Sequence, residues 1–490
     1  MKYHLWTIGC QMNVADSERI ARALHEHGHA PVATAADADL VLLTSCTVRQ
    51  GAENRLWGEL RQLGQLKKAR PELVVAVTGC VTDGNVDGFL KRAPIVDLYV
   101  NPRRPEDLLN HLAERGLIDA PDYGDLNPEK FGSGEQIATE TVSHAVSRYV
   151  PVIYGCNYRC TYCIVPYTRG DQVSRTMAEI IEESKWLLAE GARELVLLGQ
   201  TVDAYGEDLS PPSRLSDLLY ALHDLPGLER IRFLTSHPNH MTDDLIKAVA
   251  VLPKVCEHIN LPVQAGHDAT LKRMARRYTV AQYRALVDRI RARIPNVGLS
   301  TDVIVGFSGE TEEHFQGTLD LLRECAFDVV HVAAYSPRRA TPSERLWDDD
   351  VPHAEKKRRL HAVEDQQREI LKAHRGAQVG TTVQVLVEGP ASRKGRGGSN
   401  TTLGEPGTAV ADSDQKRTTR VDDAGTAPGV PGRWGGRTAT NTLVFFDSVE
   451  DPTGRLIDIE VTKASPWFLE GVSRTPVVAA SRRVILPMLA

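Results

Sequence analysis

The sequence contains no long hydrophobic run. Its longest apolar stretches, such as VVAVTG and ELVLLG, have the length of strands, whereas a membrane-spanning helix needs about 20 apolar residues. The first residues, MKYHLWTIGCQMN, also lack the apolar core of a secretory signal peptide. We therefore expect no membrane span and a cytoplasmic location, where cysteines stay reduced and more often bind metals or do chemistry than form disulfides.

An excess of basic charge is absent as well. The formal net charge of -6 gives little reason to expect a nucleic-acid partner, but net charge is a poor guide when charge is unevenly distributed. Residues 271–293, LKRMARRYTVAQYRALVDRIRAR, hold one lysine, seven arginines and one aspartate. This segment is either a solvated helix face or a phosphate-contacting face. The candidate RNA contacts are Arg273, Arg276, Arg277 and, near the C-terminus, Arg437.

The N-terminal part of the chain alternates short apolar runs with amphipathic stretches. Across residues 1–125 this alternation predicts βαβ units and a doubly wound parallel sheet. Residues 126–146 have the composition of a linker. From 147 to 375 the alternation resumes with six strand-like segments followed by helices, which predicts a partial (β/α)6 barrel. Functional side chains would then lie at the C-terminal ends of the strands.

The sequence pattern changes after residue 375 from alternating strands and helices to β segments alone. Residues 376–470 contain alternating β segments that predict a small β-barrel, a common oligonucleotide-binding design that also serves other functions. Residues about 391–435 are rich in Gly, Ser, Thr, Arg and Lys, and we expect a flexible insertion there, with RNA contact as the alternative. Residues 471–490 form a tail without a readable signal.

Three cysteines are crowded into the stretch YGCNYRCTYCIVPYTRG. Cys156, Cys160 and Cys163 follow the spacing C-x3-C-x2-C after a predicted strand. A disulfide within this set would leave one of the three thiols unpaired. A structural zinc site usually takes four ligands, so a three-cysteine zinc knuckle remains only as the alternative. Three thiolates suit a 4Fe-4S cluster with one iron open for a substrate. The arrangement resembles the radical S-adenosylmethionine (SAM) superfamily, in which SAM binds that iron and its cleavage gives a 5′-deoxyadenosyl radical.

Glycines and polar residues follow several strands of the predicted barrel. Side chains at the C-terminal ends of barrel strands are more often functional than structural, although a tight turn alone also requires glycine. We therefore expect a SAM site built partly from these positions. The candidates are Gly199, Gln200, Ser236, Gln264, Asp302 and Gly306.

Three further cysteines are far apart in the sequence. Cys10, Cys46 and Cys80 each follow a predicted strand of the N-terminal sheet, so they share the edge where open α/β sheets bind ligands. Three thiols at one edge could hold a second cluster that carries sulfur, and the alternative is three buried structural cysteines. Cys256 and Cys325 lie in apolar segments, and we expect both to be packing residues.

Taken together, these stretches resemble the methylthiotransferases over nearly the whole chain. The matching segments include GCQMNVADSERI, SCTVRQGAENRLWG, GCNYRCTYCIVPYTRG, LPVQAG and STDVIVGFSGET. The resemblance implies an N-terminal three-cysteine domain, a radical SAM barrel and a C-terminal RNA-binding TRAM barrel. GCQMN and CTVRQGAE look most like the branch that modifies the tRNA adenosine on the 3′ side of the anticodon.

The resemblance also implies cofactors, a reaction and partners. Cys156, Cys160 and Cys163 would hold the SAM-cleaving 4Fe-4S cluster, and Cys10, Cys46 and Cys80 an auxiliary 4Fe-4S cluster. One SAM would methylate a cluster-bound sulfur, and a second would supply the radical that removes hydrogen from C2 of N6-isopentenyladenosine at tRNA position 37. The partners would be the tRNA anticodon stem-loop, an electron donor such as a flavodoxin or ferredoxin, and an iron–sulfur cluster carrier, with the enzyme a monomer.

Some positions depart from the family pattern, and other functions stay open. Thr201 and Asp203 stand where the family commonly has Asn. Related enzymes methylthiolate threonylcarbamoyl-adenosine in tRNA or a β-carbon of an aspartate in a ribosomal protein. A non-catalytic RNA-binding or iron–sulfur sensor protein is the alternative from a different functional class.

Overall fold

The computed structural model divides the chain into two compact units, Met1–Gln367 and Arg368–Ala490. The predicted linker 126–146 lies almost entirely outside the described residues, as do most of the predicted insertion and of the tail. Among the residues that are described, no helix is both long and apolar enough to cross a membrane. The structure describes residues 1–46, 50–81, 85–104, 106–118, 146–391 and 431–474.

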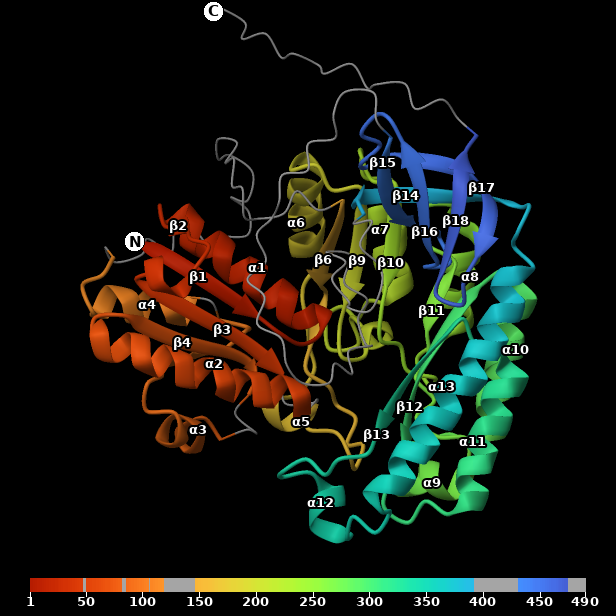
Figure 1. Ribbon diagram of the computed structural model, residues 1–490, viewed down its shortest axis with the longest axis horizontal. Coiled ribbons are helices and arrows are strands. Elements are labelled where there is room, and N and C mark those ends of the chain that lie inside the picture. Colours follow the sequence, from red (N-terminus) through yellow and green to blue (C-terminus); the bar gives the residue numbers. More distant parts are fainter. Residues whose placement is uncertain (47–49, 82–84, 105, 119–145, 392–430, 475–490) are drawn as a thin grey trace, which may run out of the picture. The chain divides into compact units, whose positions relative to one another are not determined.

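The N-terminal domain is built on a five-stranded parallel sheet. The central strands LVLLTSC and VVAVTGC are buried at every residue, as expected for parallel strands covered on both faces. The strand order is β2-β1-β3-β4-β5, and the first four of these strands are labelled in Figure 1. The strands are β1 (Lys2–Thr7), β2 (Ala30–Pro31), β3 (Leu40–Cys46), β4 (Val74–Cys80) and β5 (Leu98–Val100).

Helices cover both faces of this sheet, which confirms the doubly wound prediction. Helices α1 (Gln11–Glu26) and α4 (Glu106–Glu114) pack on one face, where Leu24 and Leu108 share a core cluster with alternate strand residues. Helices α2 (Gln50–Ala69) and α3 (Val86–Arg92) pack on the other face. The sequence did not predict α3 or β2, because both are short and carry little periodic signal.

The central domain contains six parallel strands in sequence order, as predicted. Two three-stranded sheets have the orders β10-β9-β6 and β11-β12-β13, and a parallel bridge between Ile231 and Val255 links the adjoining edges. The strands are β6 (Ser147–Pro151), β9 (Glu194–Leu198), β10 (Arg230–Phe233), β11 (His258–Asn260), β12 (Gly298–Val305) and β13 (Val329–Ala334).

Threonine caps begin four of the helices that follow these strands. Thr176, Thr242, Thr279 and Thr311 each accept a backbone hydrogen bond from the first turn, which satisfies a donor that the helix cannot pair itself. The helices are α6 (Met177–Ala189), α7 (Leu215–His223), α8 (Asp243–Val251), α9 (Asp268–Arg273), α10 (Val280–Arg293) and α11 (Glu312–Cys325). The shorter elements are β7 (Ile153–Tyr154), α5 (Val165–Thr168), β8 (Val173–Ser174) and α12 (Pro342–Leu346), and α13 (His353–Gly376) spans the boundary between the units.

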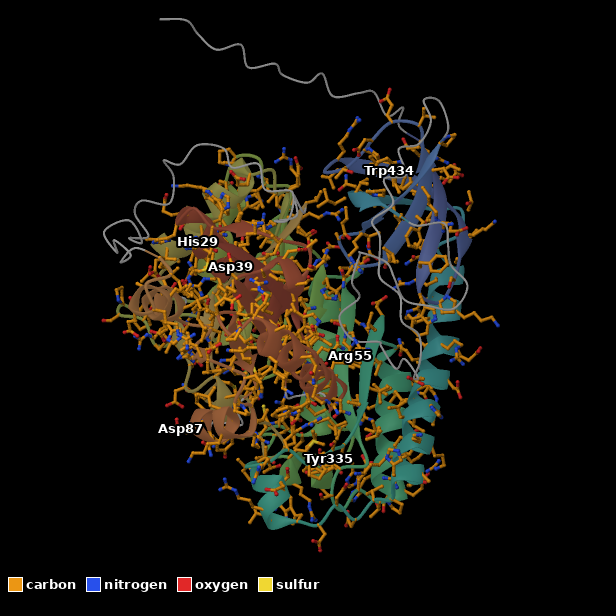
Figure 2. All side chains as sticks on the ribbon, turned by 60° about the vertical axis from the view of Figure 1, so that its left-hand side comes forward. His29, Asp39, Arg55, Asp87, Tyr335 and Trp434 are labelled. Atoms are coloured by element: carbon orange, nitrogen blue, oxygen red, sulfur yellow. The ribbon has the colours of Figure 1, made fainter. Side chains whose placement is uncertain are left out.

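The C-terminal unit is a closed five-stranded barrel, as predicted, but with different bounds. Its order is β14-β15-β16-β18-β17. The sequence assigned residues up to 435 to the insertion, yet GRWGGR forms β15, and Trp434 lies among the side chains of this barrel (Figure 2). Glycine here reflects close strand contact, because a Cβ on Gly436 would lie 2.2 Å from the carbonyl oxygen of Leu386. The strands are β14 (Thr382–Pro390), β15 (Gly432–Arg437), β16 (Leu443–Ser448), β17 (Leu456–Ala464) and β18 (Phe468–Ser473).

Candidate iron–sulfur centres

A tight loop after β7 brings Cys156, Cys160 and Cys163 onto one turn. Gly155 starts it with a φ of +69°, and a Cβ there would lie 2.1 Å from the carbonyl oxygen of Asp171. The loop closes through Cys163 N, which donates to the carbonyl of Cys160 at 3.0 Å. Cys156 and Cys160 are only 8% and 6% exposed. The backbone of one loop thus holds three cysteines, of which Cys156 and Cys160 are buried and Cys163 is half-buried.

Protein groups surround these thiols closely. The hydroxyl of Thr201 lies 3.4 Å from Cys156 Sγ, and Arg276 Nη1 donates to Cys160 Sγ at 3.6 Å. Burial raises the pKa of the Cys163 thiol to about 12, and the nearby Cys160 adds to the rise. A thiol that coordinates a metal is deprotonated outright, so these residues would bind a cluster as thiolates despite the raised pKa.

The structure corrects the expectation that Arg276 contacts RNA. Its side chain is buried and also donates to the carbonyl of Pro262 at 3.0 Å and to the Tyr278 hydroxyl at 2.8 Å. Arg273 is half-buried, with its guanidinium 4.5 Å above the Trp347 ring. Arg277 is exposed. Two other arginines of the basic segment form ion pairs, Arg284 with Glu324 and Arg289 with Asp243.

Several buried polar atoms at the ends of β9 and β10 have no partner among the described residues. They are Gln200 Oε1, Ser236 Oγ and His237 Nε2, together with Arg273 Nε from α9. Buried polar atoms are nearly always hydrogen-bonded in folded proteins. A ligand carrying amino, carboxylate and hydroxyl groups would satisfy them, so Gln200 and Ser236 fit a SAM site.

The other four candidate SAM residues are either closely packed or hydrogen-bonded within the protein. A Cβ on Gly199 would lie 2.4 Å from Ile153 Cγ2, and one on Gly306 would lie 2.4 Å from Lys356 Cγ, so close packing accounts for both glycines. Gln264 has a φ of 72° and its backbone N–H donates to the carbonyl of Asp302. The Asp302 carboxylate accepts from Asn260 Nδ2 at 3.2 Å.

Sequence reasoning did not assign a role to the pair Asp203 and His237. Both Asp203 oxygens accept from the backbone N–H of His237, at 3.0 and 2.9 Å. Burial raises the pKa of Asp203 to about 8. Burial, with the charge of Arg276, lowers the pKa of His237 to about 2, so its imidazole is neutral. The only sequence signal for this pair was the position of both residues after strands.

The second cysteine set meets at the C-terminal edge of the N-terminal sheet. Cys46 and Cys80 are direct neighbours in the register of β3 and β4. Cys10 is the N-cap of α1, and a Cβ on the preceding Gly9 would lie 2.9 Å from Cys46 Cβ. The parallel sheet therefore brings together three residues that are 36 and 34 positions apart in the sequence.

Among the described residues, no group of three His, Cys, Asp or Glu side chains is arranged to hold one metal ion. An iron–sulfur cluster binds each thiolate through a different iron atom and so separates its ligands more than one ion does. Cys256 and Cys325 are buried, with exposed fractions of 2% and 4%, as is typical of packing residues. None of the eight cysteines is in a disulfide.

An arginine six residues after Cys163 reaches the second cysteine set. Arg169 Nε donates to Cys80 Sγ at 3.0 Å, and its Nη2 donates to Asp16 Oδ2 at 2.7 Å and to Asn13 Oδ1 at 3.0 Å. Sequence reasoning missed Arg169, because nothing in YTRG predicts a contact with a cysteine 89 residues earlier.

Two family models match the chain. The model described as the radical SAM superfamily matches residues 150–322. A model described as the uncharacterized protein family UPF0004 matches residues 2–101, the domain with the second cysteine set. Among solved structures, the radical S-adenosylmethionine methyltransferase TsrM from Kitasatospora setae has a TM-score of 0.54 at 14% identity, covering 70% of this chain and 77% of that one. This likeness concerns the fold alone.

Curated relatives match nearly the full length. The tRNA-2-methylthio-N(6)-dimethylallyladenosine synthase of Chloroflexus aurantiacus is 40% identical, covering 96% of this chain and 91% of the relative. Proteins of the same name from Roseiflexus sp. and Dehalococcoides mccartyi are each 42% identical, with 96% of this chain covered and 89% and 97% of the relatives. The chain therefore belongs to the radical SAM enzymes and, among them, to the family of the tRNA-2-methylthio-N(6)-dimethylallyladenosine synthases.

Proposed function

We propose that this enzyme methylthiolates C2 of N6-isopentenyladenosine at tRNA position 37, next to the anticodon. The names of its full-length relatives support the substrate. The observation that carries the proposal is the presence of two cysteine trios in one compact unit, the first on the loop that follows β7 and the second at the C-terminal edge of a parallel sheet. Radical SAM membership itself implies one 4Fe-4S cluster and SAM. The second cluster belongs to the proposal.

The chemistry of the substrate requires such cofactors. A hydrogen on an aromatic ring carbon is too weakly acidic for a side-chain base, so general acid–base catalysis does not suffice. When bound, two clusters and two molecules of SAM would supply methyl transfer to a cluster-bound sulfur, and radical removal of the C2 hydrogen followed by methylthio insertion. The protein itself has to hold these groups, orient the adenine and exclude water.

Different residues would hold the two clusters and SAM. Cys156, Cys160 and Cys163 would hold the SAM-cleaving cluster, and Gln200 and Ser236 would bind SAM through their buried unpartnered atoms. Cys10, Cys46 and Cys80 would hold the auxiliary cluster. Thr201 and Arg276 contact the first trio and would orient its thiolates.

The substrate base is accessible without strand opening, because anticodon-loop bases are single-stranded and can turn outward. In the C-terminal barrel, the Arg433 guanidinium lies 4.8 Å from the Phe445 ring centroid, and Trp467 is exposed. Arginine and aromatic side chains on a small barrel form the kind of surface on which bases stack. Arg277 and Arg437 are the remaining candidate RNA contacts, although Arg437 also pairs with Glu388 at 3.4 Å.

The protein partners named by the resemblance, an electron donor and an iron–sulfur cluster carrier, stay predictions.

The test uses anaerobically reconstituted full-length protein with dithionite, SAM and tRNA that carries isopentenyladenosine. We expect the wild type to bind iron and sulfide for two clusters and to form the 2-methylthio nucleoside, detected by mass spectrometry. A Cys10→Ala, Cys46→Ala, Cys80→Ala variant should keep one cluster, release 5′-deoxyadenosine and form no product. A Cys156→Ala, Cys160→Ala, Cys163→Ala variant should release no 5′-deoxyadenosine.

Other results would reassign the function. Product on threonylcarbamoyl-adenosine or on a ribosomal protein, with none on isopentenyladenosine, would place the enzyme in another branch of methylthiotransferases. No release of 5′-deoxyadenosine despite two intact clusters would favour an iron–sulfur sensor.

A further inference from the structure

We infer that Arg169, a residue of the radical SAM domain, is a positioning residue for the cluster of the N-terminal domain. It would hold the Cys80 thiolate and tune the electron affinity of that cluster. The inference rests on the proposed auxiliary cluster at Cys10, Cys46 and Cys80. The inference goes beyond that proposal, because the auxiliary cluster of the N-terminal domain would then depend on a side chain of the radical SAM domain.

The chain connects the two cysteine trios by a very short path. Arg169 is six residues after Cys163, and the one-turn helix α5 (Val165–Thr168) fills the interval. The backbone N–H of Arg169 donates to the carbonyl of Val165 at 2.8 Å, which closes that turn. One short rigid segment therefore carries a ligand of the first trio at its start and a contact to the second trio at its end.

The N-terminal domain also binds the backbone around Arg169, through Arg103. Arg103 Nη2 donates to the carbonyl of Arg169 and, at 2.8 Å, to that of Asp171. Gly155 and Gly170 lie beside this guanidinium, and a Cβ on Gly155 would lie 2.5 Å from Arg103 Nη2. Here Arg103 of one domain and Arg169 of the other each reach across, and the two contacts fix the position of Arg169 relative to the sheet edge.

The guanidinium of Arg169 is deeply buried with its counter-ion. The side chains of Arg169 and Asp16 are only 3% and 0% exposed. Burial raises the pKa of Asp16, although the charge of Arg169 opposes the rise. Burying a charged pair is costly and gives little stability by itself. Such a pair beside three cysteines is therefore better explained by a function at that place than by stability.

Two atoms of this pair lack a partner in the part of the chain that the structure describes. Arg169 Nη1 and Asp16 Oδ1 are both buried without a hydrogen bond. An arginine presents five donors in a planar fork, and Nε of this one already reaches Cys80 Sγ. A donor left over next to a thiolate suits an anionic sulfur species, and a thiolate-ligated cluster supplies that chemistry.

The expected effect of this contact on a cluster has a definite sign. A cation and a hydrogen-bond donor next to a ligand sulfur stabilise the added electron of the reduced cluster, which raises its reduction potential. Replacing Arg169 should therefore lower the potential. It should also loosen the cluster, because the Cys80 thiolate loses the hydrogen bond from Arg169 Nε.

The experiment isolates one cluster in full-length protein. In the Cys156→Ala, Cys160→Ala, Cys163→Ala background, any bound cluster belongs to the other trio. We compare this parent with its Arg169→Met and Arg169→Lys derivatives, measuring iron and sulfide content, the midpoint potential by redox titration monitored by EPR, and the rate of iron loss to a chelator. Circular dichroism melting checks the fold of each protein.

Arg22→Lys in the same background is the matched control. Arg22 also joins the two domains, and its contacts are to residues of α6, at 3.5 Å from Glu183 and 3.9 Å from the centroid of the Trp186 ring. It therefore reports what loosening the domain contact does by itself.

We expect Arg169→Met to give a more negative midpoint potential and several-fold faster iron loss than the parent. Arg169→Lys should give a smaller change of the same sign, because it keeps the charge but not the fork. If Arg169→Met does not fold, Arg169→Lys decides the question. A potential and a rate equal to those of the parent would overturn the inference, and so would equal changes in Arg22→Lys. A parent that binds no cluster would instead contradict the proposed two-cluster function.

Discussion

The imidazole ring of His237 lies flat on the phenol ring of Tyr158, with ring centroids 3.8 Å apart and planes 15° apart. Tyr158 stands between Cys156 and Cys160 in the loop, and His237 follows β10. The stack therefore ties the cysteine loop to the end of a barrel strand. The neutral state of His237 favours this contact, because a charged imidazole would have to be desolvated.

His237→Ala should weaken the cluster at this loop. In a Cys10→Ala, Cys46→Ala, Cys80→Ala background, we expect less iron per chain after reconstitution, measured by colorimetric assay. A double-mutant cycle with Tyr158→Ala, measured by denaturant unfolding, should give a coupling energy of about 0.5–1.5 kcal/mol, as for other aromatic pairs. His314→Ala is the control, since it removes a stack with His267 at 4.1 Å that involves no cysteine loop. Equal iron loss in the control would contradict the prediction.

Asp203 should make the folded state less stable as pH rises. Its pKa is raised from 3.8 to about 8 by burial. Between these values the folded protein holds a proton that the unfolded chain has released, so stability falls with increasing pH. His237 acts in the opposite direction, because its folded pKa is depressed. We expect the difference in melting temperature between wild type and Asp203→Asn to change steadily from pH 4 to pH 8 in favour of the variant. A difference that is constant with pH would show that Asp203 does not titrate in this range.

Glu183 should stabilise the contact between the two domains. It lies 2.5 Å from Arg175 Nη1 and 3.5 Å from Arg22 Nη1. Burial alone would raise its pKa, but Arg175 and Arg22 lower it to about 2. Its contribution is therefore complete above pH 4.5 and is lost as pH falls toward 2. At neutral pH, Glu183→Gln leaves the half-buried cations Arg22 and Arg175 without this counter-ion, and we expect a loss of roughly 3 kcal/mol by denaturant unfolding, the lower end for a buried pair.

Glu182→Gln is the control for that measurement. Glu182 is the preceding residue of α6 and pairs with Lys185 at 2.6 Å, but both side chains are exposed. Exposed ion pairs contribute about 0–1 kcal/mol, so this variant should be nearly as stable as wild type. A loss in Glu182→Gln equal to that in Glu183→Gln would mean that helix α6, and not the domain contact, is being weakened.

Gly79→Ala should disturb the edge that carries Cys80. Gly79 has a φ of +97°, and a Cβ there would lie 2.3 Å from the backbone oxygen of Ser45. Neither strand can move without shifting Cys46 or Cys80. We expect a melting temperature lower than that of Gly28→Ala, whose φ of +76° carries the same kind of backbone cost of about 1 kcal/mol but whose Cβ meets nothing within 4 Å. Iron bound at the second trio should fall in Gly79→Ala only.

Much of the architecture followed from local pattern. Runs such as LVLLTSC and VVAVTGC are buried parallel strands because each begins with four consecutive apolar residues, and threonine caps mark where the helices begin. The short elements α3 and β2 escaped prediction for lack of periodic signal. Strand β15 escaped because its glycines have the composition of a loop, although for Gly436 close contact with Leu386 is the physical reason.

The sequence by itself determined the three domains, the spacing of Cys156, Cys160 and Cys163, and the placement of Cys10, Cys46 and Cys80 after strands. These features are local, since strand periodicity and loop spacing are written in consecutive residues. Only the tertiary structure decided that Arg276 turns inward to Cys160, and that Arg169 crosses to Cys80 and Asp16. The direction of an arginine depends on which buried anion or sulfur lies within its reach, and that is fixed by packing between segments far apart in the chain.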